Sequence, residues 1–290
     1  MLIQIGTNLH NDYADCVKGA DTDARVGQAR ATQKGWLTPN QTAQASTVVL
    51  MGALFIGVYF LRELQAVNNQ QDVDHLFLWV AITSIFNAFA YTGGPYPLGY
   101  IGLGKFSIGY LGLGDIFVFL YFGIVATMGI PYLHDRLIEN PGQPTEDTLT
   151  RLFYDLDRPS FLALAATEVG MLATNILVVN NLRDRHTDVH AGKKTTAVRM
   201  GPVFCRLQYT ALCFGAFMLV IMDYQLKKAK DEHKQNFVRL WPLFAMPLAR
   251  QGILAIWKND GAELNAHVGK TALLQFVFCI LLGAAFLRSP

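Results

Sequence analysis

The stretch that decides the fold is FLALAATEVGMLATNILVV followed by NNLRDRHTDVHAGKKTTAVRMG, which together run from Phe161 to Gly201. Up to Val179 the sequence is almost uninterruptedly apolar and has the length that crosses the core of a bilayer. Beyond it, Asn180, Asp184 and Asp188 recur at every fourth position, so a helix that continues would carry all three on one face. We therefore expect carboxylates and neighbouring cations at a membrane surface, where they can hold a divalent cation and an anionic group.

A second polar cluster lies near the start of the chain, in NDYADCVKGADTDARVGQARATQKGW, from Asn11 to Trp36. Within a helix, Asp15 would share a face with Asp12 and Asn8, or alternatively with Asn11. Further charged residues follow at Lys18, Asp21, Arg25, Arg30 and Lys34. Each cluster alone could be a solvated loop between membrane helices, but two clusters with helical phase favour a shared site.

Composition places the chain among polytopic α-helical membrane proteins. Of its 290 residues, 52% are hydrophobic and only 16% are charged, whereas soluble domains carry about 25% charged residues. The net charge of +2 is too small to indicate a nucleic-acid partner, and the sequence indicates no protein partner. The four cysteines are scattered without a CxxC pair, so we expect reduced apolar residues rather than disulfides or zinc ligands.

Seven segments have roughly the length that a membrane-spanning helix needs. Because backbone polar groups must be paired within each segment in lipid, we expect an all-α transmembrane bundle. The expected spans are Ala43–Leu61, His75–Tyr91, Asp115–Leu133, Phe161–Val179, Val203–Met222, Leu240–Ile256 and Ala272–Leu287. An apolar stub, Met1 to His10, precedes them and is expected to be the end of a helix whose beginning is absent. We expect residues 1–290 to form a single transmembrane domain that is incomplete at its N-terminus.

The expected topology places both polar clusters on one side of the membrane. Four of the expected spans separate the clusters, and an even number of crossings returns the chain to the side it left. Loops on that side carry more Lys and Arg than loops on the other side, which favours the cytoplasm or its plastid-stroma equivalent.

Three further features allow a structural or a functional interpretation. The connector from Tyr91 to Gly114, YTGGPYPLGYIGLGKFSIGYLGLG, is glycine-rich and could cap a site or simply join two spans. Glu168 and Arg250 are ionisable residues inside expected spans, where they are costly unless they face a partner or a cavity.

The two clusters together have the chemistry of a magnesium–diphosphate site. Magnesium prefers oxygen ligands and binds through a few carboxylates together with substrate phosphates. Suitable ligands are Asn11, Asp12, Asp15, Asp184 and Asp188. Neutralising the charge of a diphosphate lowers the cost of its departure, and an apolar bundle would shelter an allylic cation from water.

The two clusters resemble the two aspartate motifs of the UbiA superfamily of intramembrane prenyltransferases. Within it, the chain is most similar to the 1,4-dihydroxy-2-naphthoate prenyltransferases of menaquinone and phylloquinone synthesis. Further matching pieces are ATQKG from Ala31, YTGGPYPLGYIGLG from Tyr91 and GDIFVFLYFG from Gly114. The second motif, DxxxD, is met by Asp184 and Asp188. The first, NDxxDxxxD, is met by Asn11, Asp12 and Asp15, but Gly19 stands at its last aspartate position.

The resemblance implies nine transmembrane helices around a central cavity, so that helix one and part of helix two would be missing here. It implies transfer of a long prenyl group, polyprenyl or phytyl, from its diphosphate to the naphthoate ring, with loss of diphosphate and carbon dioxide. It also implies a bacterial inner membrane or a plastid membrane, with the active site on the cytoplasmic or stromal side.

The resemblance also suggests residue roles. The expected catalytic residues are Asp15, Asp184 and Asp188, and the expected Mg²⁺ ligands are Asn11, Asp12, Asp15, Asp184 and Asp188. The candidate contacts to the diphosphate are Lys34, Arg183, Lys193, Lys194 and Arg199.

Two alternatives remain at the level of the sequence. The acceptor could be 4-hydroxybenzoate, homogentisate or a chlorophyllide instead of the naphthoate. In another functional class, the chain could be an ion-coupled membrane transporter, although its acidic clusters lie at span ends and not near the middle of the membrane.

Overall fold

The computed structural model describes residues 1–17, 19, 26–68, 73–90, 113–154, 160–190, 193–230 and 237–288. Every regular element within these ranges is a helix, which confirms the all-α prediction. The chain divides into two compact units that each combine segments distant in sequence. Unit 1 comprises Met1–Gly114, Pro131–Leu149 and His186–Thr195, and unit 2 comprises Asp115–Ile130, Thr150–Arg185 and Thr196–Pro290.

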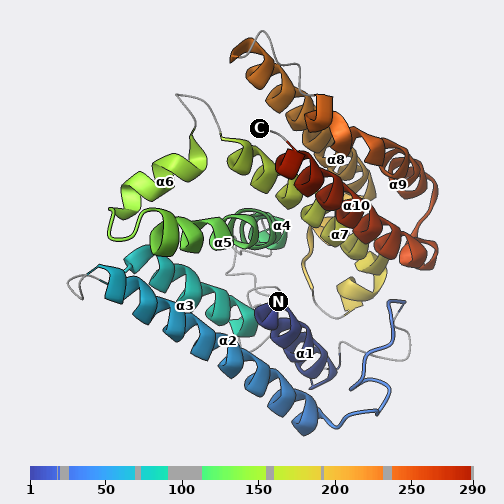
Figure 1. Cartoon of the computed structure of the whole chain (residues 1–290). Coiled ribbons are helices and arrows are strands. Elements are labelled where there is room, and N and C mark those ends of the chain that lie inside the picture. The colour runs from blue at the N-terminus through green and yellow to red at the C-terminus, as the bar shows by residue number, and fades with distance from the viewer. Residues whose placement is uncertain are drawn as a thin grey trace. The chain divides into compact units, whose positions relative to one another are not determined.

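Unit 1 contains α1 (Leu2–Val17), α2 (Pro39–Val67) and α3 (His75–Ala90), which lie side by side (Figure 1). The α1–α2 contact is close because Gly6 lacks a side chain: a Cβ there would lie 2.5 Å from Leu50 Cγ. Ser46 Oγ on α2 donates a hydrogen bond to the Gly6 carbonyl at 2.8 Å. The start of α2 is capped by Thr38, whose hydroxyl accepts from Gln41 N in a capping box.

The rest of unit 1 is joined by a buried polar cluster around Asp74, which lies just before α3. Asp74 Oδ1 accepts from Phe77 N at the start of that helix. Its Oδ2 accepts from Tyr132 at the end of α5 (Ala126–His134) and from Arg136 in the π-helical segment η4 (Asp135–Glu139). The short helix α6 (Thr145–Phe153) follows, between two of the expected spans.

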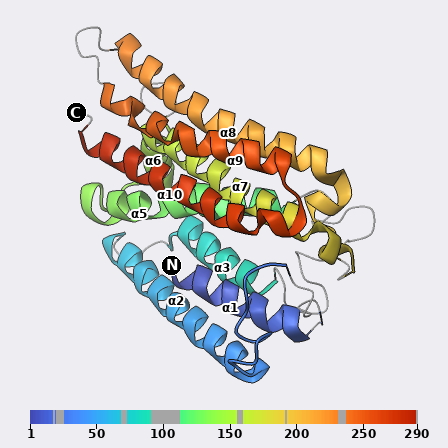
Figure 2. The same ribbon diagram turned by 90° about the vertical axis from the view of Figure 1, so that its right-hand side faces the viewer.

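Unit 2 contains α7 (Phe161–His190) as far as Arg185, together with α8 (Thr196–Lys230), α9 (Met246–Lys258) and α10 (Asn265–Arg288). These helices run alongside one another (Figure 2). The 3₁₀ segments η5 (Phe237–Ala245) and η6 (Gly261–Leu264) connect them. The chain from α4 (Leu113–Val118) through the π-helical segment η3 (Phe119–Val125) packs on α7. Gly123 and Gly170 meet there, and a Cβ on Gly123 would also lie 2.9 Å from Ala166 O.

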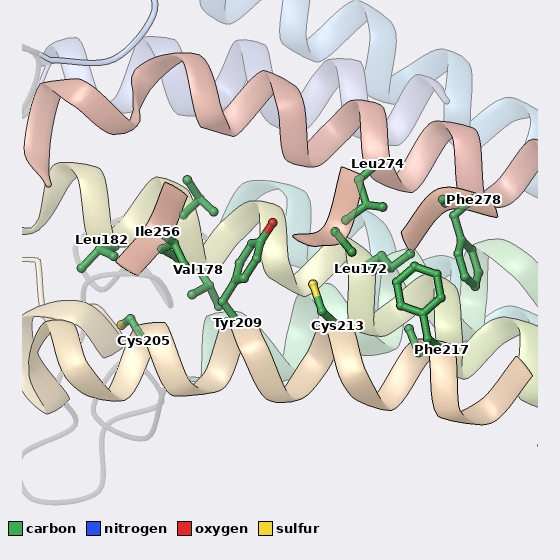
Figure 3. Close-up of a cluster of buried hydrophobic side chains, with 14 of the residues drawn as sticks. Leu172, Val178, Leu182, Cys205, Tyr209, Cys213, Phe217, Ile256, Leu274 and Phe278 are labelled. Carbon is green, nitrogen blue, oxygen red and sulfur yellow. The ribbon is translucent and has the colours of Figure 1, made fainter. Parts of the chain in front are cut away.

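The core of unit 2 lies between α7, α8, α9 and α10 (Figure 3). Phe217 on α8 and Phe278 on α10 form an edge-to-face pair with ring centroids 5.5 Å apart. Tyr209 is fully buried, and its hydroxyl lies 3.2 Å from Thr271 Oγ1. Cys205 and Cys213 are buried free thiols, as the sequence predicted for all four cysteines.

Within the described residues, five helices are long and apolar enough to cross a membrane: Pro39–Val67, Gly114–Glu139, Phe161–His190, Thr196–Lys227 and Gly261–Arg288. These helices contain five of the seven expected spans, and the shorter apolar helix α3 corresponds to a sixth. The seventh, Leu240–Ile256, falls on η5 and α9. With its family membership, established below, these helices make the protein an integral membrane protein.

The two ionisable residues that the sequence places inside expected spans, Glu168 and Arg250, do not pair with each other. Glu168 is buried in unit 2, whereas Arg250 is exposed on α9. The glycine-rich connector, apart from its end at residues 113–114, lies outside the described residues.

Candidate active site

The first aspartate motif lies on the last two turns of α1. Asp15 is 1% exposed, and its Oδ2 forms ion pairs with Arg30 Nη1 at 2.6 Å and Lys193 Nζ at 3.3 Å. Arg30 also donates to the Asn11 carbonyl at 3.1 Å and so fastens the following segment to the helix. A buried carboxylate is stable here because two cations compensate its charge.

Asp12 occupies a different environment on the same helix. Its Oδ2 accepts a hydrogen bond from Thr32 N at 3.3 Å, and Thr32 Oγ1 lies 2.8 Å from Thr42 Oγ1 on α2. Its Oδ1 is buried and has no hydrogen-bond partner among the described residues. An acceptor oxygen of this kind is suited to a cation or a donor.

The second motif continues α7 without a break, as the fourfold spacing predicted. Arg183 is 3% exposed and holds the Asp184 carboxylate in a two-point contact, with Nε–Oδ1 at 2.7 Å and Nη2–Oδ2 at 2.6 Å. The same guanidinium donates to Asn180 at 2.8 Å and to Asn265 at 3.3 Å. Arg183 thus neutralises and orients Asp184.

Asp188 lies one helical turn beyond Asp184 and is buried. Its carbonyl accepts from Lys193 N at 2.8 Å, so Lys193 is held close to the end of α7. The Lys193 side chain contacts Asp15. Residues 178 positions apart therefore meet within unit 1, and a cation that follows the second motif contacts the first.

The remaining predicted residues lie between α1 and α2 and at or just before the start of α8. Lys34 is exposed in the turn at residues 31–35, where its backbone N–H bonds to the Arg30 carbonyl. Lys194 is half-buried, and Arg199 is exposed in the first turn of α8. Lys18, Asp21 and Arg25 lie outside the described residues.

Arg30 is the residue that the sequence-based assignment of roles missed. It was counted only as nearby positive charge, yet it makes the shorter of the two ion pairs to Asp15. One signal was available, because Arg30 directly precedes the ATQKG piece that matches the family. Its pairing with Asp15 across the intervening segment could not be read from spacing.

The donor set fits magnesium held jointly with a diphosphate. Within the described part of the chain, no three His, Cys, Asp or Glu side chains gather tightly enough to hold a metal by themselves. Magnesium does not require such a cage, since it usually takes one or two carboxylates plus phosphate oxygens and water. On α1, the open Asp12 Oδ1 is a carboxylate oxygen of that kind. On α7, Asp184 and Asp188 lie one turn apart and carry carboxylates of the same kind.

The comparison with known proteins identifies the family. A model described as the UbiA prenyltransferase family matches residues 1–227. The chain belongs to the UbiA prenyltransferase family. This UbiA protein is therefore a prenyltransferase, and the transporter interpretation is not supported. No solved structure matches the chain.

Several characterised relatives match most of this UbiA chain. The 1,4-dihydroxy-2-naphthoate octaprenyltransferase of Haemophilus influenzae is 28% identical over 99% of the chain and 81% of its own length. The Escherichia coli protein of the same name is 34% identical over 76% of the chain and 61% of its own length. UbiA prenyltransferase domain-containing protein 1 of Dictyostelium discoideum is 26% identical over 93% of the chain and 69% of its own length.

Proposed function

We propose that this prenyltransferase transfers a long prenyl group, polyprenyl or phytyl, from its diphosphate to 1,4-dihydroxy-2-naphthoate in menaquinone or phylloquinone synthesis. The observation that carries the proposal is the similarity to proteins named 1,4-dihydroxy-2-naphthoate octaprenyltransferase over nearly the full chain. The cation-balanced carboxylates of the two aspartate motifs, buried at Asp15 and partly buried at Asp184, support it, because their cations suit an anionic substrate.

In the proposed reaction, the bond between the prenyl carbon and the diphosphate oxygen breaks and the diphosphate keeps the electron pair. The ring carbon that bears the carboxylate forms the new bond to the prenyl carbon. Carbon dioxide then leaves, and the electrons of its bond restore the aromatic ring. No proton has to be removed from the attacked carbon, so the atoms and charges balance without a base at that position.

The proposed roles of the motif residues follow from their charges. Asn11, Asp12, Asp15, Asp184 and Asp188 are the ligands we assign to Mg²⁺, which supplies charge neutralisation of the diphosphate when bound. Asp15, Asp184 and Asp188 are the catalytic carboxylates of this set. Lys34, Arg183, Lys193, Lys194 and Arg199 are assigned as diphosphate contacts, with Arg30 added because it shares Asp15 with Lys193.

The cations are already positioned to exchange partners. Arg183 is bound to Asp184, and both Arg30 and Lys193 are bound to Asp15. A diphosphate can accept from the same guanidinium and ammonium groups, because phosphate and carboxylate oxygens offer similar acceptor geometry. Substrate would then replace internal ion pairs, and no unpaired charge has to be buried before it binds.

The proposal includes the setting of the enzyme. We place the site at the cytoplasmic or stromal side of a bacterial inner membrane or a plastid membrane, as the Lys and Arg bias of the loops indicates. We also propose that residues 1–290 act as one catalytic domain.

The test is a turnover assay with purified protein in lipid, a labelled polyprenyl diphosphate and Mg²⁺. Four acceptors are compared: 1,4-dihydroxy-2-naphthoate, 4-hydroxybenzoate, homogentisate and a chlorophyllide. We expect prenylated product, diphosphate and carbon dioxide in equal amounts with the naphthoate, and loss of turnover when EDTA removes Mg²⁺. Preferred turnover of another acceptor would overturn the naphthoate assignment, and undiminished turnover in EDTA would overturn the magnesium assignment.

A matched pair of variants tests the site. Asp184→Ala is expected to lower turnover by at least about a hundredfold, the scale of losing one main electrostatic group. Asp260→Ala is the control, because Asp260 is also held by an arginine of α7, Arg185, in a two-point contact at 2.8 and 2.6 Å. Equal losses in both variants would indicate a structural role for Asp184.

A further inference from the structure

A polar cluster in unit 2 is centred on Asp115, which lies within the GDIFVFLYFG segment and has no role in the proposed function so far. Asp115 is 8% exposed and belongs to α4. Its Oδ2 accepts from Thr196 Oγ1 at 3.0 Å and from Gln208 Nε2 at 2.9 Å, both on α8. Thr174 Oγ1 of α7 lies 3.5 Å from the Asp115 carbonyl oxygen. Three helices therefore position one carboxylate.

Two oxygen atoms of this cluster are left unsatisfied. Asp115 Oδ1 and Gln208 Oε1 are both buried, and neither has a hydrogen-bond partner among the described residues. Leaving buried polar atoms unpaired is costly, so such atoms usually have a partner that is absent from the protein itself. A carboxylate oxygen and an amide oxygen only accept hydrogen bonds. The missing partner must therefore be a hydrogen-bond donor.

The cluster lies deeper in the apolar span than the aspartate pair of the second motif. Asp184 follows Thr174 by ten residues on α7, which is about 15 Å along the helix axis. Asp188 lies within about 40° of the face that carries Thr174, since each residue turns a helix by about 100°. A donor bound at Asp115 would thus lie on the membrane-interior side of a diphosphate bound at Asp184.

We propose that Asp115 Oδ1 and Gln208 Oε1 share the proton of one ring hydroxyl of the aromatic acceptor, and that these two residues determine the selection and position of that acceptor. This inference rests on the proposed function. Of the two substrates, only the aromatic one can supply the donor, because the prenyl chain has none and the diphosphate mainly accepts. A dihydroxylated ring carries such donors, and its apolar edges suit the interior of the span.

The cluster predicts a specific effect of an isosteric change. Because Thr196 and Gln208 both donate to Oδ2, an Asp115→Asn variant would place its amide oxygen there. The NH₂ group would then occupy the position of Oδ1. An acceptor would thereby become a donor, without a change in size, and the hydrogen bond from the ring hydroxyl to a charged oxygen would be replaced by a weaker one from the neutral amide to the hydroxyl oxygen.

The experiment compares the hydroxylated acceptor with its monomethyl ethers in the wild type and in Asp115→Asn. For the wild type, methylation of the bound hydroxyl is expected to lower kcat/KM by about tenfold or more, the scale of one hydrogen bond to a charged group. For Asp115→Asn, KM for the hydroxylated acceptor should rise about tenfold, whereas KM for the prenyl diphosphate stays unchanged. The preference against the ether should disappear, because the amide can donate to an ether oxygen.

Two further variants complete the test. Gln208→Met keeps the side-chain length and removes the second acceptor oxygen. It should therefore weaken the preference for the hydroxylated acceptor over its ether, as Asp115→Asn does. If Asp115→Asn does not fold, Gln208→Met provides the test. Asp223→Asn is the control, because Asp223 is equally buried, lies on α8 and is bound by Arg239 at 2.6 and 2.9 Å. It should leave the preference between acceptor and ether intact.

Distinct results separate this inference from the proposed function. If the wild type uses another hydroxylated aromatic acceptor, the same comparison with that acceptor and its ether decides the role of Asp115. Unchanged discrimination in Asp115→Asn and Gln208→Met, in an active enzyme, would overturn the inference and indicate that the cluster binds only water. Absence of turnover with every hydroxylated acceptor would overturn both.

Discussion

Asp15 shows how a single buried carboxylate depends on its neighbours. It is almost inaccessible, yet it contacts two cations from different parts of the chain, Arg30 and Lys193. A buried ion pair usually contributes little to the free energy of folding, because desolvation of the charges offsets most of their Coulomb attraction. The proposed role of Asp15 in binding would account for this arrangement at the end of an apolar helix.

The Asp15→Asn variant tests this interpretation. The amide keeps the shape of the side chain but removes the charge that Arg30 and Lys193 share, and it is a poorer magnesium ligand. We expect prenyl transfer to fall by at least about a hundredfold in a single-turnover assay, while the amount of protein extracted from membranes is unchanged. Wild-type turnover would remove Asp15 from the proposed catalytic set.

The Arg183→Lys variant tests whether the geometry of the guanidinium matters as well as its charge. Lysine keeps the charge but cannot make the two-point contact that Arg183 makes with Asp184. It could not make such a contact with a diphosphate either. We expect KM for the prenyl diphosphate to rise about tenfold in steady-state kinetics. The matched control is Arg185→Lys, which breaks the corresponding contact with Asp260 and should leave that KM unchanged.

At the scale of the element, the continuity of α7 is the central finding. Its fourfold spacing of polar residues predicted one helical face, and the helix does run on to His190. Local periodicity is sufficient for such a prediction because backbone hydrogen bonding in a helix is local. The partners of the helix were not predictable in this way. Arg183 donates a hydrogen bond to Asn265 on α10 only because the two helices pack together.

The contact between η3 and α7 allows a prediction about packing. In a Gly123→Ala variant, the new methyl group would meet the backbone of Gly170 and Ala166, which cannot move aside as a side chain can. We expect a loss of about 1–3 kcal/mol, typical of overpacking, measured as a lower thermal midpoint in detergent. Gly129→Ala is the control, because nothing lies within 4 Å of its Cβ position and alanine favours the helix. Equal midpoints for both variants would contradict the close approach.

At the scale of the whole molecule, the proposed orientation in the membrane can be tested with single cysteines. In a background without the four native cysteines, Ala29→Cys and Gln143→Cys place thiols at exposed positions on the two expected sides. We expect a membrane-impermeant maleimide to label Gln143→Cys in intact cells, and Ala29→Cys only in inverted vesicles. The reverse pattern would invert the topology, and labelling of both from one side would contradict the three crossings expected between residues 29 and 143.

The sequence by itself determined the membrane class, the helical fold and the position of both aspartate motifs. Hydropathy, helical phase and motif spacing are properties of neighbouring residues, so they can be read before the chain folds. Only the tertiary structure decided that Arg30 and Lys193 share Asp15, that Arg183 holds Asp184, and that Asp115 and Gln208 keep buried oxygens open. These pairings join residues as many as 178 positions apart, and they depend on how helices pack, which no local pattern specifies.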